Sequence, residues 1–391
     1  EKKLSFREAA VSEVTKAAKE HSGCAIITES EGTGIFTNVS KITVAALAKS
    51  SEDDLPACIS ASGKAEEFAE ILKDPDIVKY GYDLKHQRNI LIHNGFGLEG
   101  RFMDIELLHY LINPEKSHKI DILSRTYLEI NLEDSLPQPK EDVALSLFDE
   151  IPEDEDHPER FAEASATLLL GMKIWEEIVE KDLKSLYDTI EEPLLKVLSD
   201  MEMEGVKIDL AQLRNYSSAL AVEMNDIQER VREMAGEPNL NILSPIQIGN
   251  LIFEKLKLDP KIKPKTGVRY SYPTDEDTLS ALADKHPIIN EILEYRGVRK
   301  LLSTYIDPLP TCVSPVTGKI HTTFNQALTA TGRLSSSKPN LQNIPIRTER
   351  GKEIRKAFIS SRPDGVIVSA DYSQIELRIM AHLSCDTHII E

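Results

Sequence analysis

The spacing of the apolar residues changes near residue 190, and this change indicates that the chain contains more than one kind of domain. Before it, short apolar runs alternate with helical stretches, which is typical of an α/β domain. Strands are predicted at 25–27, 35–36 and 77–80, and helices at 64–72 and 161–181. After it, long helices predominate. With 391 residues, the chain has room for two or three domains.

The longest predicted helix lies between Asp209, which can cap its first turn, and Gly236, which can end it. Seven apolar residues between Leu213 and Met234 recur in steps of three and four, which indicates a packed helix. The other predictions for this part are a helix from Pro193 to Gly205, a strand at 206–208, and helices beginning at Ser244-Pro245, at the capping pair Thr274 and Asp277, and at residue 288. The helix end capped by Ser244 can hold a phosphate, although most such ends hold nothing.

Basic residues are concentrated in one part of an otherwise acidic chain. The formal net charge is −19, yet residues 296–362 contain twelve basic and three acidic residues. Within the helix predicted at 288–305, Arg296, Arg299 and Lys300 share one stripe. A solvated face normally mixes both signs, so this segment favours contact with a polyanion.

Composition excludes several classes of protein. No apolar run approaches the roughly 18 residues of a membrane span, and residues 1–4 lack the apolar stretch of a signal peptide, so we expect a soluble intracellular chain. The four cysteines show no CxxC pairing, which argues against a disulfide framework or a zinc ribbon. Residues 133–159 contain eleven acids, one lysine and four prolines, and are predicted to form a solvated loop.

Near the C-terminus, Asp371 is the strongest candidate for a metal ligand. Residues 366–370 predict a short buried strand that ends at Asp371, and Ser373 is the predicted cap of a following helix. The apolar face of that helix is predicted to contain Ile375, Ile379 and Leu383. A carboxylate between a buried strand and a helix is well placed for a hard cation. The spacing alone nevertheless favours an ordinary cap or turn.

Two long motifs resemble the palm of the family A DNA polymerases, the bacterial DNA polymerase I group. TATGRLSSSKPNLQNIP (329–345) and SADYSQIELRIMAHLS (369–384) match that family's signatures almost letter for letter and in the same order. Weaker similarity extends back through EEPLLKVLSDMEMEGVKID and LEYRGVRKLLSTY to the start of the chain. The resemblance implies a multi-domain α/β fold. Its parts are a ribonuclease-H-like, exonuclease-type α/β domain at 1–180, a helical thumb with palm-base helices at 181–318, and the first part of an antiparallel-sheet palm at 319–391.

The same resemblance implies a DNA-templated DNA polymerase that adds deoxynucleotides to a primer 3′-hydroxyl with two Mg²⁺ ions. Asp371 matches the acid that binds both ions, and Tyr372 matches the residue whose carbonyl binds one. Glu376 matches the residue that excludes a ribose 2′-hydroxyl, and Arg333 matches an arginine at the minor groove of the primer terminus. The other implied nucleotide-binding residues are Ser373, Gln374 and Ile375. The other implied DNA-binding residues are Arg296, Lys300, Asn340, Gln342, Asn343, Ser244 and Lys265.

In the first domain, the family's 3′→5′ exonuclease site is incomplete. Its leading Asp-x-Glu appears as Ile27-Thr28-Glu29, its second Asp appears as Gln87, and its last motif aligns with Glu159 and Glu163. Because two of four acidic ligands are neutral, we predict no proofreading. A single weak cation site at Glu29 and Glu163 remains a minor alternative. Asp104 is expected to be a structural cap.

The resemblance stops about twenty residues after Asp371, at the end of the chain. The family's fingers helix and second palm acid have no counterpart, so we expect a fragment of a longer polymerase, one that does not extend primers alone. The alternatives are a non-catalytic primer–template-binding module and a 3′→5′ exonuclease. The expected partners are primer–template duplex DNA and deoxynucleoside triphosphates, with no membrane. The expected form is a monomer in a bacterial cytoplasm, associated with the nucleoid and acting in DNA replication or repair.

Overall fold

The structure is a computed structural model that describes residues 2–49, 55–136, 158–264, 272–345 and 348–390. Most of the predicted acidic loop, and Lys265, therefore lie outside the described residues. The chain forms two compact units. Unit 1 contains residues 1–205, 314–317 and 321–343, and unit 2 contains residues 206–313, 318–320 and 344–391. Among the described residues, no helix combines the length and the apolar character needed to cross a bilayer.

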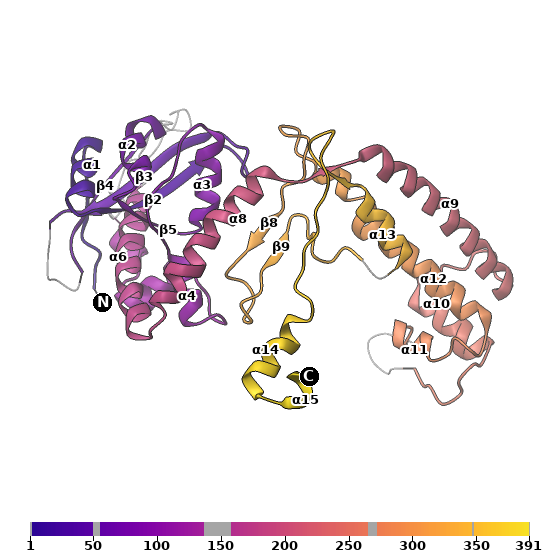
Figure 1. The fold of residues 1–391 in the computed structure, drawn as a ribbon. Coiled ribbons are helices and arrows are strands. Elements are labelled where there is room, and N and C mark those ends of the chain that lie inside the picture. The colour runs from indigo at the N-terminus through magenta and orange to yellow at the C-terminus, as the bar shows by residue number, and fades with distance from the viewer. Residues whose placement is uncertain (1, 50–54, 137–157, 265–271, 346–347, 391) are drawn as a thin grey trace, which may run out of the picture. The chain divides into compact units, whose positions relative to one another are not determined.

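A six-stranded mixed sheet forms the centre of unit 1 (Figure 1). The strand order is β1-β4-β3-β2-β5-β6, in which β2 is antiparallel to β3 and parallel to β5. The strands are β1 Phe6–Glu8, β2 Gly23–Ser30, β3 Val39–Leu47, β4 Cys58–Gly63, β5 Val78–Gly81 and β6 Phe102–Asp104. The strands predicted at 25–27 and 77–80 are confirmed. The strand predicted at 35–36 is wrong, because this stretch follows the positive-φ turn residues Gly32 and Gly34 and forms a bend before β3.

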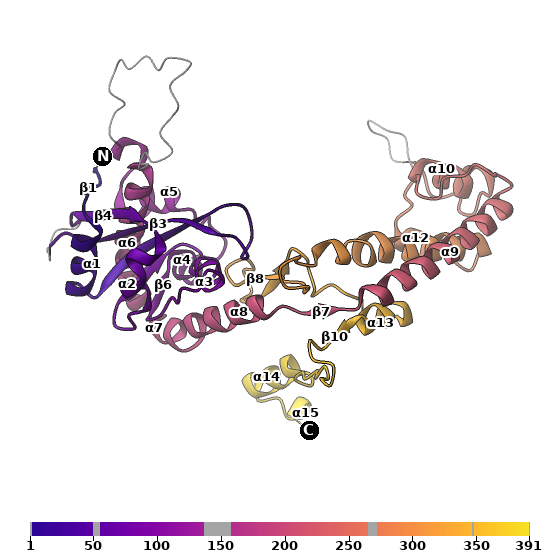
Figure 2. The same cartoon turned by 90° about the horizontal axis from the view of Figure 1, so that it is seen from above.

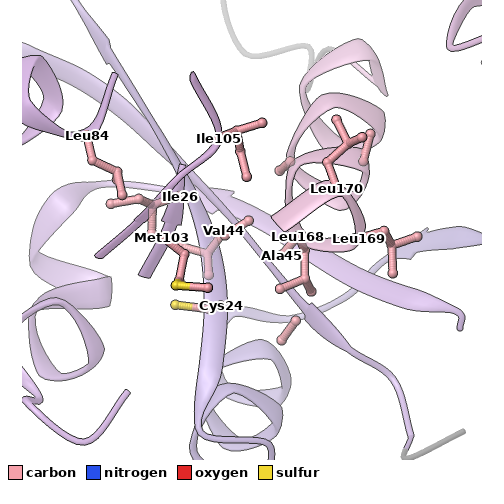
Figure 3. Close-up of a cluster of buried hydrophobic side chains, with 14 of the residues drawn as sticks. Cys24, Ile26, Val44, Ala45, Leu84, Met103, Ile105, Leu168, Leu169 and Leu170 are labelled. Atoms are coloured by element: carbon pink, nitrogen blue, oxygen red, sulfur yellow. The ribbon is translucent and has the colours of Figure 1, made fainter. Parts of the chain in front are cut away.

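Helices pack around the sheet, and their apolar side chains form the core of unit 1 together with those of the strands. They are α1 Val11–Glu20, a short 3-10 helix Ala65–Phe68 continued by α2 Ala69–Lys73, α3 Leu84–His93, α4 Ile105–Ile112, α5 Ile120–Leu123, α6 Pro158–Glu180, α7 Lys184–Leu186 and α8 Glu192–Glu204. Figure 3 shows Leu168, Leu169 and Leu170 of α6 near core residues of the strands. Each fully buried leucine contributes about 1.5–3 kcal/mol. The helices predicted at 64–72, 161–181 and 193–205 are confirmed.

A two-stranded antiparallel hairpin completes unit 1. Strands β8 Thr323–Asn325 and β9 Ser335–Ser337 pair with Phe324 opposite Ser336, and α8 contacts β8 (Figure 1). The loop between the strands includes Arg333. The hairpin therefore belongs to the same compact unit as the α/β domain. Phe324 of β8 contacts Glu202 of α8, although 122 residues separate the two in the sequence.

Unit 2 is mainly helical, as the periodicity predicts. Helix α9 Leu210–Ala235 packs beside α12 Pro287–Leu301 (Figure 2). Asp209 Oδ1 caps α9 by accepting from the N–H groups of Ala211 and Gln212 at 3.0 Å, and Gly236 ends it in the left-handed region. Other elements of unit 2 are β7 Lys207–Ile208, α10 Pro245–Gly249, α11 Glu276–Ser280, α13 Glu349–Lys356 and β10 Phe358–Ile359, which pairs with β7. The cap predicted at Thr274 is wrong, because Asp275 accepts from Thr278 N–H at 2.9 Å instead.

The segment around Asp371 differs most from prediction. Residues 366–370 form no strand, and Val366 and Val368 are 80% and 83% exposed. A strand depends on a neighbour for its backbone hydrogen bonds, and none lies beside it among the residues that the structure describes. Helix α14 Ile375–Ser384 begins after Gln374, so the predicted Ser373 cap is also wrong. Its apolar face, Ile375, Ile379 and Leu383, is exposed, and α15 Thr387–Ile390 follows.

Candidate functional site

The residues aligned with the exonuclease site meet in unit 1. Glu29 lies on β2, Gln87 on α3, and Glu159 and Glu163 on the first turns of α6. The Gln87 side chain accepts from Thr28 N–H at 2.9 Å and donates to the Tyr82 carbonyl at 2.9 Å. A carboxylate could not make the second bond, so glutamine suits this backbone arrangement without any metal.

Arg160, a partly exposed cation that the sequence did not single out, joins the two remaining acids. Its Nε donates to Glu29 at 2.8 Å and its Nη1 donates to Glu163 at 2.7 Å. Burial opposes the charge on Arg160, but the hydrogen bonds and charges of Glu163 and Glu29 raise its pKa above the ordinary value. One guanidinium thus bonds to both carboxylates and offsets one of their two negative charges. The residues present do not fit a two-metal centre.

Asp104 has the structural role that the sequence predicts. Its carboxylate caps α4 by accepting from Leu107 N–H at 3.2 Å, and it also accepts from Leu84 N–H at 2.6 Å at the start of α3. Burial, followed by the charges of Glu106 and Asp83, raises the pKa of Asp104 to about 8. The residue connects two helix N-termini, which accounts for its position without catalysis.

The hairpin of unit 1 carries the candidates for contact with a primer terminus. Arg333 is exposed in the loop between β8 and β9, and Asn343 is exposed after β9. Gln342 Oε1 accepts from Ser336 N–H at 3.1 Å, and Asn340 Oδ1 accepts from Gln342 N–H at 3.0 Å. Asn340 and Gln342 therefore hold the shape of their own loop, a role that the sequence did not predict.

The duplex-binding candidates of unit 2 lie on two helices. On α12, Arg296 is half-buried and donates to the Thr274 carbonyl, and burial lowers its pKa, whereas Lys300 is exposed. Ser244 caps α10 by accepting from Gln247 N–H at 3.3 Å, as the Ser-Pro pair predicts. The Ser244 oxygen thus accepts from its own helix, and its O–H is still a donor.

The metal-binding candidates lie together in an exposed segment of unit 2. Asp371 precedes Tyr372, which is exposed, and Glu376 lies in the first turn of α14. The Ser373 carbonyl accepts from Arg378 Nε at 2.9 Å. A carboxylate and a backbone carbonyl are hard oxygen donors, which suits Mg²⁺. Within the described ranges, however, no group of three His, Cys, Asp or Glu side chains is arranged to hold a metal ion.

Comparison with known proteins agrees with this architecture. Residues 210–391 match DNA polymerase family A, and residues 39–133 match the ribonuclease H-like domain of DNA polymerase I. The chain belongs to the family A DNA polymerases, and its fold is the expected α/β, multi-domain one.

The relatives are bacterial DNA polymerases I. The chain is 40% identical over 331 residues to DNA polymerase I of Bacillus subtilis (strain 168), covering 84% of this chain and 36% of that protein. It is 42% identical over 335 residues to DNA polymerase I of Synechocystis, covering 83% and 32%. The chain thus spans about a third of the length of the curated relatives it matches.

Among solved structures, the chain resembles the POL domain of Pol1 from M. smegmatis, in complex with DNA primer-template and dNTP. The TM-score is 0.77 at 30% identity, and the match covers 98% of this chain and 63% of that one.

Proposed function

We propose that this chain provides the primer–template-binding part and the first metal ligand of a DNA-templated DNA polymerase, which extends a primer 3′-hydroxyl with deoxynucleoside triphosphates. The observation that carries the proposal is the family A match over residues 210–391, which contains Asp371 and Glu376. A module that only binds DNA has no use for an acid beside phosphates, which disfavours the non-catalytic alternative. In this proposal the protein acts as a monomer in DNA replication or repair, in the bacterial cytoplasm at the nucleoid.

The donor chemistry of Asp371 and the Tyr372 carbonyl supports a role in holding Mg²⁺. When bound, two such ions activate the primer hydroxyl and neutralise charge on the leaving pyrophosphate. Glu376, five residues after Asp371, blocks the 2′ position of the sugar by excluded volume and by leaving a ribose hydroxyl unpaired. Ser373, Gln374 and Ile375 complete the proposed nucleotide-binding segment.

Arg333 is the proposed probe of the primer terminus. Its exposed guanidinium suits the minor groove, where every correct base pair offers acceptors in similar positions. Asn340, Gln342 and Asn343 follow in the same segment. Their proposed DNA contacts include their backbone and the outer edges of the amides, because Asn340 and Gln342 already hydrogen-bond within the loop.

Duplex phosphates are the proposed ligands of unit 2. The exposed Lys300 and half-buried Arg296 offer positive charge on one helix, and Ser244 and Lys265 are proposed to extend this contact. Phosphate contacts predict a steep loss of affinity with salt. We expect binding of labelled primer–template to weaken at least tenfold between about 50 and 200 mM NaCl.

We also propose that the nuclease-like domain does not proofread. Gln87 bonds to two backbone groups, and Arg160 pairs with both Glu29 and Glu163. A neutral Gln87 and a cation already bonded to both glutamates leave too little negative charge to balance two divalent cations, which disfavours the exonuclease alternative. Incubation of a labelled single-stranded primer with Mg²⁺ or Mn²⁺ tests it, since robust trimming by the purified chain contradicts this proposal.

A primer-extension assay tests the polymerase proposal itself. We propose that these 391 residues bind primer–template without extending it, because among the described residues no group of three His, Cys, Asp or Glu side chains gathers at Asp371 to hold metal ions. Extension that disappears in Asp371→Asn would support polymerase chemistry and contradict the inactivity of the isolated chain. Absence of any primer–template binding at low salt would contradict the proposal as a whole.

A further inference from the structure

We propose that the nuclease-like domain acts as a support for the loop that carries Arg333, through Tyr110 and Glu202 as positioning residues. The loop lies between β8 and β9. The Thr329 carbonyl of the loop bonds to α4, and the Phe324 N–H of the adjoining strand β8 bonds to α8. The inference rests on the proposed function for the role of Arg333, but the attachment itself can be measured without DNA.

The first attachment runs from α4 to the start of the loop. Tyr110 is 5% exposed, and its hydroxyl donates to the Thr329 carbonyl at 2.6 Å. The Thr329 hydroxyl in turn donates to the Arg333 carbonyl at 2.6 Å. Two consecutive hydrogen bonds thus connect the core of the nuclease-like domain to the backbone of Arg333.

The second attachment is a buried ionic network at β8. Glu202, which is 3% exposed, pairs with Lys85 of α3. The carboxylate also accepts from Asn89 Nδ2 at 2.7 Å and from the Phe324 N–H at 2.7 Å. Because a buried carboxylate needs several partners, this network specifies one position for β8 relative to α3 and α8.

Helix α3 shows that the support is separate from the remnant nuclease site. Lys85 and Asn89 bond to α8, whereas Gln87, two residues from each, bonds to Thr28 of β2. Residues two apart on a helix face nearly opposite sides. One side of α3 therefore presents Gln87 to β2, and the other side bonds to the glutamate that holds the hairpin. In this proposal, the nuclease-like domain supports the hairpin independently of any cleavage of DNA.

Tyr110→Phe tests the first attachment with little risk to folding, because only the hydroxyl is removed. Tyr82→Phe is the matched control, since that hydroxyl bonds to Glu106 at 3.3 Å within the domain. By hydrogen-exchange mass spectrometry, we expect amides of residues 329–337 to exchange about tenfold faster in Tyr110→Phe only, with the β3 amides unchanged. Unchanged exchange at 329–337 would contradict the attachment.

The functional consequence is measured with the same variant and two duplexes. We expect the ratio of Kd values for mismatched and matched primer termini to fall about threefold in Tyr110→Phe, with Tyr82→Phe unaffected. In an Arg333→Ala background, Tyr110→Phe should change this ratio no further, because both changes act through one side chain. An equal effect with and without Arg333 would assign Tyr110 a merely structural role and overturn the inference.

Two double variants test the second attachment without leaving a buried charge unpaired. Lys85→Met with Glu202→Gln keeps an oxygen for the Phe324 N–H, whereas Lys85→Met with Glu202→Met removes it. Only the double variant with Glu202→Met is expected to accelerate hydrogen exchange at the Phe324 amide and to lower the ratio of Kd values for mismatched and matched primer termini. Equal exchange of the hairpin amides in both double variants would contradict the role of Glu202. If the chain binds no primer–template, the proposed function fails, while the exchange results still decide whether the hairpin is supported in this way.

Discussion

Arg160 donates a hydrogen bond to Glu29 at 2.8 Å, although 131 residues separate them in the chain. Its other contact is with Glu163, at 2.7 Å and one turn further along α6. The guanidinium holds the strand and the helix together among the residues that the sequence aligns with the family's exonuclease site.

Arg160→Gln is expected to expose a weak cation site without restoring a nuclease. Because Arg160 is 41% exposed, losing its ion pairs should cost only about 0.5–1 kcal/mol. With Glu29 and Glu163 unpaired, millimolar Mn²⁺ should raise the melting temperature of the variant and not that of the parent. Arg230→Gln, which breaks an exposed pair with Glu291, is the control. Equal Mn²⁺ effects in all three proteins would contradict this prediction.

Gly171→Ala should destabilise unit 1 through a steric conflict. A Cβ at Gly171 of α6 would lie 2.2 Å from Cδ1 of Tyr80, on β5. Overpacking of this kind costs about 1–3 kcal/mol, measured by urea unfolding. Gly297→Ala in α12 is the matched control, because its Cβ would meet nothing within 4 Å. Gly297→Ala should stabilise the chain by about 0.5–1 kcal/mol, because alanine has the higher helix propensity. A loss of stability in Gly297→Ala would contradict this expectation.

Stability should decline in mild acid because of His109. Its Nδ1 lies 2.7 Å from Nδ1 of His118, and burial together with the His118 charge lowers the pKa of His109 to about 4. The folded state therefore favours neutral His109, so its contribution is complete above about pH 6.5 and is lost as the pH falls toward 4.

Thermal unfolding of His109→Gln between pH 7 and pH 5 measures this effect. The melting temperature of the variant should depend less on pH than that of the parent. His382→Gln, at an exposed histidine, should behave as the parent does. A parent and His109→Gln with the same pH dependence would exclude His109 as the group responsible.

Lys300→Ala should reduce the salt dependence of DNA binding. Removing one phosphate contact lowers the slope of log Kd against log salt by about one. Lys16→Ala removes an exposed lysine of α1 that pairs with Glu20, so it should leave the slope unchanged. Equal slopes for all three proteins, measured by fluorescence anisotropy, would remove Lys300 from the phosphate-binding surface.

Local structure was predicted well where the determining interactions are close in sequence. Asp209 caps α9 and Gly236 ends it because capping and left-handed stop signals act within one turn. The apolar period between these two residues likewise depends only on helix geometry. The errors have local causes too: at α11, Asp275 competes successfully with the neighbouring Thr274 for the cap.

The strand predicted at 366–370 failed for a different reason. Its apolar residues satisfy a strand pattern, but a strand also requires a paired neighbour, and the described chain supplies none there. Hydrophobic pattern alone therefore could not establish burial beside Asp371.

By itself, the amino-acid order determined the family and the succession of an α/β domain and long helices, and it predicted an exonuclease-type site with Ile27 and Gln87 in place of acids. These features are properties of motifs and of periodic spacing. Only the tertiary structure placed Arg160 between Glu29 and Glu163, and Tyr110 against the loop of Arg333. Such contacts join residues that are distant along the chain, so they depend on how sheet and helices pack and on which side chains that packing brings within hydrogen-bonding distance.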